Sequence, residues 1–262
     1  MITQEMLLKV FICFLAGAGA GIGTGFAGMS AAGIIGPMLM TFCGLKPYQA
    51  IGIGLASDVL ASAVSAWTYK KNKNLDVKNA MPMLISVLCM TIVGSFIASF
   101  LPDKAMGGFS QFGLLFLGIK FLLKPDSTVK VKEQTGDKSS LVKKAILGGT
   151  IVGFICGFVG AGGGMMMLFV LTSFLGYEIH MAVGTSVFIM AFTAFIGGAS
   201  HFVIEGIPDI TCLVLCVVFT LIWARIAAVI ANKASSRNLS RAAGVVMVLS
   251  SGVVLFFNYF MK

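Results

Sequence analysis

The chain consists largely of long apolar segments separated by short polar loops. A helix of about 20 apolar residues crosses the hydrocarbon core of a bilayer, and most of these segments are that long. Charged residues make up only 11% of the chain, too few to cover a water-soluble globule. We therefore predict an all-α polytopic membrane protein and exclude a soluble globule, a disordered chain and a nucleic-acid-binding domain. The ten apolar segments cover residues 5–26, 30–44, 48–69, 80–101, 106–123, 144–160, 164–176, 181–203, 210–231 and 241–260.

Two of the segments are too short to span a membrane. Residues 30–44 and 164–176 reach about 20 Å as helices, whereas the hydrocarbon core is about 30 Å thick. Each follows a glycine-rich stretch that a helix cannot cross without cost. We predict that both short segments are broken or re-entrant helices. The two breaks read Gly23-Thr24-Gly25-Phe26-Ala27-Gly28-Met29-Ser30 and Gly157-Phe158-Val159-Gly160-Ala161-Gly162-Gly163-Gly164.

The two breaks occupy equivalent places in an internal repeat. A shift of 132 residues lays Gly25-Phe26-Ala27-Gly28 on Gly157-Phe158-Val159-Gly160, and nine of the 38 positions from 21 to 58 are then identical. A polar stretch separates the copies. We predict an N-terminal repeat over residues 1–124, a cytoplasmic linker over 125–143 and a C-terminal repeat over 144–262.

The lysine and arginine residues predict the orientation of the chain. Cytoplasmic loops carry an excess of these residues, which assigns the loop 70–78, the linker and the loop 233–241 to the cytoplasm. The loops at 103–104 and 205–209 are then external, and both termini lie outside. Loops that match under the shift fall on opposite sides, so the two five-segment repeats are predicted to be inverted. The aromatic residues that fit membrane-interface anchors are Trp67, Tyr69, Trp223 and Tyr259.

Short broken helices at matching places in two repeats are typical of a transporter binding site. The first amides of a helix lack intrahelical partners and carry partial positive charge, so two converging helix starts can bind an anion without a lysine. Ser30 could serve as an N-cap or as a hydroxyl donor, and Thr185 and Ser186 are further candidate donors. The predicted substrate-binding residues are Gly28, Ser30, Ala31, Gly160, Gly162, Gly163, Gly164, Thr185 and Ser186.

Two titratable residues are candidates for proton coupling. Asp58 is the one carboxylate deep in a predicted span. An acidic residue inside a membrane span is a candidate functional residue, because burying its charge in lipid is costly. His201 lies near the external end of its segment, and histidine titrates near neutral pH.

Each assignment has a structural alternative. Asp58 could be satisfied by Ser57, Ser62 or a neighbouring helix end. A lone interfacial histidine is often structural, and hydroxyls in membrane helices often bond a carbonyl of their own helix. The break glycines could serve only close helix packing, as we expect of four others. These are Gly17, Gly21, Gly25 and Gly52.

The sequence lacks the common motifs of nucleotide-hydrolysing, metal-binding and hydrolytic sites. The sequence contains no Walker A motif, no His-Glu-x-x-His and no grouping typical of a serine hydrolase. The six cysteines lie inside apolar segments without metal-ligand spacing, so we expect them in the core. We therefore expect no enzymatic activity, no cofactor and no metal site.

With these motifs the sequence resembles the sulfite exporter TauE/SafE family of membrane permeases. The resemblance rests on the second glycine break, on Ala182-Val183-Gly184-Thr185-Ser186, and on Gly197-Gly198-Ala199-Ser200-His201. It implies a permease for small sulfur-containing anions, such as sulfite or organosulfonates, in a bacterial plasma membrane.

The expected function is secondary active transport of such an anion, coupled to protons and operating by alternating access. The expected partners are the small anionic substrate and the lipid bilayer, and no nucleic acid; the sequence leaves the oligomeric state open. Two alternatives are an anion channel with the same pocket and a non-transporting membrane scaffold subunit.

Overall fold

The computed structural model describes residues 4–98, 108–123, 138–159, 163–206 and 208–260. Within these ranges the chain forms ten α-helices and no strand, which confirms the all-α prediction, and each helix coincides with one predicted apolar segment. The helices are α1 (Gln4–Ala27), α2 (Ala32–Cys43), α3 (Pro47–Lys71), α4 (Val77–Ala98), α5 (Gly108–Leu123), α6 (Lys138–Val159), α7 (Gly163–Ser173), α8 (Ile179–Glu205), α9 (Ile210–Lys233) and α10 (Ser236–Phe260).

The lengths of the helices separate spanning from non-spanning elements. In the described ranges, α1, α3, α4, α8 and α9 are long and apolar enough to cross a membrane. In contrast, α2 has 12 residues and α7 has 11, so both are too short, as predicted. Large apolar side chains face outward, among them Phe116 and Val203, whose exposed fractions are 73% and 86%. An outer surface of this kind suits lipid, and the chain is a multi-pass membrane protein.

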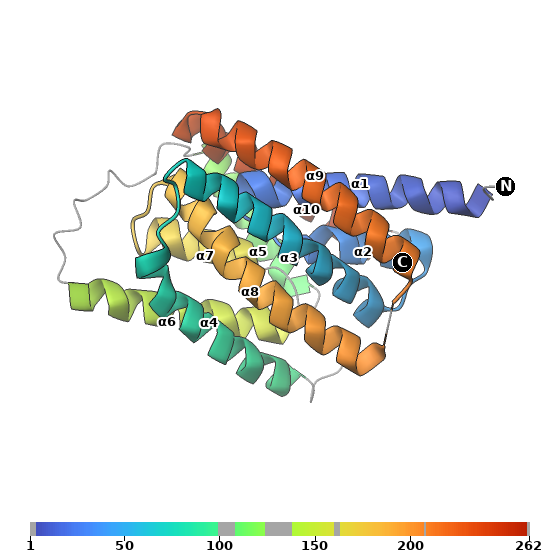
Figure 1. Cartoon of the computed structure of the whole chain (residues 1–262), viewed down its shortest axis with the longest axis horizontal. Coiled ribbons are helices and arrows are strands. Elements are labelled where there is room, and N and C mark those ends of the chain that lie inside the picture. Colours follow the sequence, from blue (N-terminus) through green and yellow to red (C-terminus); the bar gives the residue numbers. More distant parts are fainter. Residues whose placement is uncertain (1–3, 99–107, 124–137, 160–162, 207, 261–262) are drawn as a thin grey trace.

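The centre of the bundle is formed by α3 and α8, which lie side by side (Figure 1). Around this pair, α1 packs along α9, α4 packs along α6, and α5 packs along α10. Each pair joins a helix that ends before residue 125 to one that begins at Lys138 or later. Helices from the two parts of the chain are therefore interlaced.

Glycines allow the close approach of these helix pairs. A Cβ atom on Gly21 of α1 would lie 2.6 Å from the carbonyl oxygen of Thr220 on α9, and one on Gly153 of α6 would lie 2.5 Å from that of Val87 on α4. No side chain fits at either place. Gly17 and Gly25 meet α9 in the same way, and Gly52 meets α8, so the packing role predicted for these glycines is confirmed.

The turns that follow α2 and α7 have the same geometry. Gly44 and Gly176 both adopt a left-handed backbone conformation, with φ of 64° and 71°. The Leu45 amide donates to the Leu39 carbonyl at 3.3 Å, and the Tyr177 amide donates to the Leu171 carbonyl at 2.9 Å. These atoms are equivalent under the 132-residue shift. The inverted orientation of the two repeats stays a prediction.

Candidate anion-binding site

The first glycine break ends α1 inside the protein. Gly28 has a φ of 61°, which favours glycine, and its amide donates to the Thr24 carbonyl at 3.0 Å. The Thr24 hydroxyl lies 2.8 Å from the Met29 carbonyl oxygen and bridges the break. Thr24, Met29 and Ser30 are all buried. The irregular backbone is therefore enclosed by protein, which is the condition for its existence at membrane depth.

Tyr69 holds the end of α1 from the neighbouring helix α3. Its side chain is completely buried, and its hydroxyl donates to the Gly25 carbonyl at 2.9 Å. The prediction that Tyr69 is an interface anchor is therefore wrong. A tyrosine near a helix end looks the same in sequence whichever face it occupies; nearby Trp67, which is 63% exposed, fits the anchor position.

The start of α7 meets the first break. A Cβ atom on Gly164 would overlap the carbonyl oxygen of Gly28, and a Cβ atom on Gly28 would overlap the hydroxyl of Ser186 on α8. Gly163 lies beside Cys156 of α6. The structure thus brings together Gly28, Gly164 and Ser186, which the sequence predicts to belong to one site. The other two predicted glycines, Gly160 and Gly162, lie outside the described residues.

The start of α2 faces Asp58. The N-cap residue of α2 is Ala31, and no side chain of the described residues caps the helix, so the N-cap role predicted for Ser30 is wrong. The Ser30 side chain and the Ala31 amide instead face the Asp58 carboxylate on α3. Asp58 is completely buried, and its Oδ1 accepts a hydrogen bond from Ser62 at 2.9 Å. Its Oδ2 has no hydrogen-bond partner among the described residues.

The surroundings of Asp58 contain hydroxyls and an amide but no positive side chain in the described ranges. Ser57 does not contribute, because its hydroxyl donates to the Ile53 carbonyl at 2.8 Å. The positive potential at the carboxylate comes from the first amides of α2. The alternative that Ser62 satisfies Asp58 is therefore correct for one carboxylate oxygen, and the other oxygen has no partner within the described ranges.

Thr185 lies away from this site although it precedes Ser186. Its hydroxyl accepts a hydrogen bond from the Asp76 amide at 3.3 Å, in the loop between α3 and α4. The Ser186 hydroxyl donates to the Val183 carbonyl of its own helix at 2.9 Å while it lies against Gly28. Adjacent residues on a helix point about 100° apart, so only one of the two hydroxyls can face the break.

His201 forms contacts at the opposite end of α3. Its Nδ1 lies 3.3 Å from the Tyr48 carbonyl oxygen, and the two rings are 5.2 Å apart. Tyr48 precedes Asp58 by about 15 Å along the helix. His201 therefore does not contact Asp58, and its part in proton coupling stays a prediction.

A polar network at the lysine-rich end of the bundle was not predicted. The Tyr177 hydroxyl donates to Asp76 Oδ2 at 3.0 Å, and the Ser236 hydroxyl donates to Glu178 Oε1 at 2.6 Å. Burial raises the pKa of Glu178, but hydrogen bonds from Ser236 and His180 outweigh it and leave the pKa below its ordinary value. The network ties together the loops after α3, α7 and α9. Polar loop residues have no periodicity, so the sequence carried no signal for these pairings.

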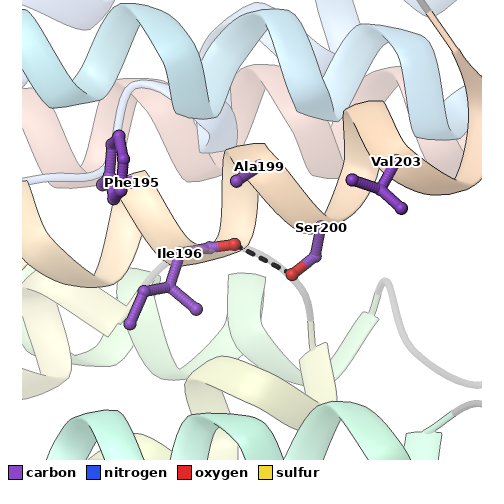
Figure 2. A pocket seen from close by; sticks show the side chains of 5 residues that line it. All are labelled: Phe195, Ile196, Ala199, Ser200 and Val203. Carbon is purple, nitrogen blue, oxygen red and sulfur yellow. Dashed lines mark hydrogen bonds between the residues drawn. The ribbon is translucent and has the colours of Figure 1, made fainter.

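An apolar groove lies on the outer face of α8 and contains none of the predicted site residues. Its one hydroxyl, on Ser200, already donates to the Ile196 carbonyl at 2.9 Å. The groove therefore offers no free donor to an anion and faces the region that lipid would occupy. Figure 2 shows its lining residues, Phe195, Ile196, Ala199, Ser200 and Val203.

The cysteines and acidic residues do not gather into a metal site in the described ranges. Cys13, Cys212 and Cys216 are completely buried in one apolar cluster with side chains of α2 and α3. The position of these three agrees with the core role expected from the sequence, Cys43 and Cys156 are partly buried, and the expectation is wrong for Cys89, which is exposed on α4.

The sequence is similar to those of known proteins. The family model described as "Sulfite exporter TauE/SafE" matches residues 13–254. The "Probable membrane transporter protein YdhB" of Bacillus subtilis is 25% identical over 227 residues, which are 86% of this chain and 90% of that protein. A "Probable membrane transporter protein" of Haemophilus influenzae is 27% identical over 210 residues, 77% of this chain and 76% of its own length. "Probable membrane transporter protein YunE" of Bacillus subtilis is 21% identical over 196 residues, 70% of this chain and 72% of that protein.

Proposed function

Because the chain belongs to the sulfite exporter TauE/SafE family of membrane transporters, we propose that it is a secondary active transporter of a small anion. The substrate is sulfite, an organosulfonate or a related sulfur oxyanion. Transport is coupled to protons and proceeds by alternating access. The bacterial relatives and the lysine-rich loops support a location in a bacterial plasma membrane with both termini outside.

The observation that carries this proposal is the contact between the two breaks. Gly28, which precedes α2 by one short loop, touches Gly164 in the first turn of α7. We infer that the start of α2, four residues after Gly28, and the start of α7 together supply unpaired amides and partial positive charge to one place. That combination binds small oxyanions at helix N-termini in many proteins.

The anion is held mainly by backbone amides around residues 28–31 and 160–164. Ser30 and Ser186 add hydroxyls, because Ser186 lies against Gly28 and Ser30 begins the approach to α2. We assign Thr185 to the packing of the loop between α3 and α4, where its hydroxyl has a partner.

Asp58 carries the coupling proton. It is completely buried, and within the described part of the chain one of its oxygens lacks a partner, so its charge state depends on what occupies the start of α2. Protonation removes a negative charge that would otherwise repel the substrate.

Alternating access is supported by the pairing of the helices. The 132-residue shift places α1 on α6 and α4 on α9. The packed pair α1 and α9 therefore corresponds to the packed pair α6 and α4, as an inverted repeat predicts. Such repeats supply two equivalent packings around one fixed site. The equivalent turns after α2 and α7 support the same relation.

The test is transport by purified protein in proteoliposomes. With an inward proton gradient, a coupled transporter accumulates radiolabelled sulfite above equilibrium, saturates with substrate and loses accumulation when a protonophore is added. Asp58→Asn should abolish accumulation and retain exchange. Glu5→Gln, which removes an exposed carboxylate at the start of α1, is the matched control and should behave as the natural protein.

The outcomes separate the candidates. Flux that only equilibrates and never saturates would support the anion channel. Proton-driven uptake that survives Asp58→Asn would show that the coupling assignment is wrong. The substrate itself is identified by thermal stabilisation of the purified protein with sulfite, sulfate, thiosulfate, taurine, sulfoacetate and small carboxylates, because a ligand of the folded state raises its melting temperature.

A further inference from the structure

Gly54 brings the start of α2 against α3. A Cβ atom at this position would lie 2.5 Å from the Ala32 Cα and 3.2 Å from the Ala32 nitrogen. Asp58 follows one helical turn later on the same face of α3. The absence of a side chain at Gly54 therefore allows the Asp58 carboxylate to face the Ala31 amide, directly before α2.

The carboxylate faces this helix start without a competing charge. The groups around it are the Ser62 hydroxyl from its own helix and the Ser30 hydroxyl and Ala31 amide that precede α2. In the described parts of α1, α2, α8 and α9, no charged or titratable side chain faces it. One carboxylate oxygen has no hydrogen-bond partner among the residues that the structure describes, and the site is completely buried.

The start of α7 has a different neighbour. Under the 132-residue shift Asp58 corresponds to Met190 and Ala32 corresponds to Gly164. A Cβ atom on Gly164 would overlap the Met190 sulfur as well as the Gly28 carbonyl oxygen. The start of α2 therefore lies beside a carboxylate of the protein, whereas the start of α7 lies beside a neutral thioether and a backbone carbonyl.

The charges of the two helix starts decide how many anions this region holds. Each start is equivalent to roughly half a positive charge, so the two together offset about one negative charge. An ionised Asp58 already supplies that charge. A bound anion beside an ionised Asp58 would leave a second, uncompensated charge in a buried site, which is strongly unfavourable.

We propose that Asp58 is a tethered anion that occupies the start of α2 when the substrate is absent, and that the substrate displaces it. This inference rests on the proposed transport function and adds a mechanism for its coupling. The site holds one negative charge at a time. When the substrate anion takes the α2 amides, the displaced carboxylate accepts one proton from solvent, so one proton enters with each anion.

The experiment measures anion binding and proton uptake together. Methanesulfonate is the probe, because a sulfonate stays ionised across the assay range and any pH dependence then belongs to the protein. Calorimetric titrations of the full-length purified protein in buffers of different ionisation enthalpy give both the affinity and the protons taken up. Sulfite is titrated in parallel, and Glu5→Gln is the control for the loss of a carboxylate.

The natural protein and Glu5→Gln should take up about one proton per anion at alkaline pH. Their methanesulfonate affinity should fall roughly tenfold for each pH unit above the titration of Asp58, as linkage to one proton requires. Asp58→Asn should bind with no proton uptake and no pH dependence, and more tightly than the natural protein at alkaline pH.

Binding without proton uptake in the natural protein overturns the inference, and this measurement stands even if Asp58→Asn does not fold. Equal pH dependence in the natural protein and Asp58→Asn also overturns it and leaves the transport proposal intact. If neither methanesulfonate nor sulfite binds to any of the proteins, the proposed function fails and the inference fails with it.

Discussion

Replacing Gly28 with alanine should destabilise the protein by about 2–5 kcal/mol, because two separate costs combine at this position. Its φ of 61° places a non-glycine residue in the left-handed region at a cost of about 1–2 kcal/mol. The added Cβ atom also overlaps the Ser186 hydroxyl, and overpacking of a buried site typically costs about 1–3 kcal/mol. Rotation of Ser186 relieves the overlap only by breaking its 2.9 Å hydrogen bond to the Val183 carbonyl.

Two other glycines of the same region separate these costs. Gly44 has a φ of 64° but no atom within 4 Å of an added Cβ, so Gly44→Ala should show the backbone cost alone, about 1–2 kcal/mol. Gly33 has neither a left-handed φ nor a neighbour within 4 Å. Gly33→Ala should therefore be neutral or stabilise α2 by up to about 1 kcal/mol.

The overlap is tested by removing the Ser186 hydroxyl. Ser186→Ala alone should cost less than about 1.5 kcal/mol, the range for one hydrogen bond. The double variant with Gly28→Ala should be more stable than the sum of the single effects by about 1–3 kcal/mol. The free energies come from denaturant unfolding in detergent micelles, followed by circular dichroism. Effects that add without coupling, or a Gly28→Ala no worse than Gly44→Ala, would refute the contact between α1 and α8 described above.

Three further substitutions test other contacts. Tyr69→Phe removes the hydroxyl that donates to the Gly25 carbonyl at 2.9 Å. It should lower the free energy of unfolding by about 1–3 kcal/mol, because it leaves a buried carbonyl unpaired. The control Tyr48→Phe, at an exposed ring, should change the free energy of unfolding by under about 0.5 kcal/mol. A hydrogen bond from Lys9 lowers the pKa of Asp209, so the pKa in the folded protein lies below that in the unfolded chain. The stability that this carboxylate contributes is therefore present above about pH 4 and is lost as the pH falls through the lowered pKa. Asp209→Asn should flatten that part of a profile of melting temperature against pH. Gly21→Val should separate α1 from α9, because even a Cβ atom would lie 2.6 Å from the Thr220 carbonyl oxygen. A cysteine cross-link between these two helices should then form more slowly. An unchanged rate of cross-linking would contradict the packing of α1 on α9.

The sequence predicted the membrane class, the ten helices and the two short segments. These properties are local: apolar composition over about 20 residues decides whether a segment suits lipid, and clustered glycines weaken a helix wherever they occur. The deep position of Asp58 followed from its distance to the segment ends in the same way. The packing role of Gly21 and its neighbours was also predictable, because small residues at helical spacing leave a flat face.

The sequence grouped residues that the tertiary structure separates. Thr185 and Ser186 are adjacent, yet one faces the loop after α3 and the other faces Gly28. Tyr69 has the position of an interface residue and points into the protein instead. Such outcomes depend on the rotation of each helix about its axis. This rotation is set by the surface of the neighbouring helix and leaves no mark in local composition.

The amino-acid sequence by itself determined that this chain crosses a bilayer and where its helices break, since both follow from the transfer of side chains and backbone out of water. Only the tertiary structure decided that Gly28 lies against Gly164 and Ser186, and that the Asp58 carboxylate reaches the start of α2. These contacts join residues far apart in the chain, and they form only where glycines let the backbones of different helices approach more closely than any side chain would allow.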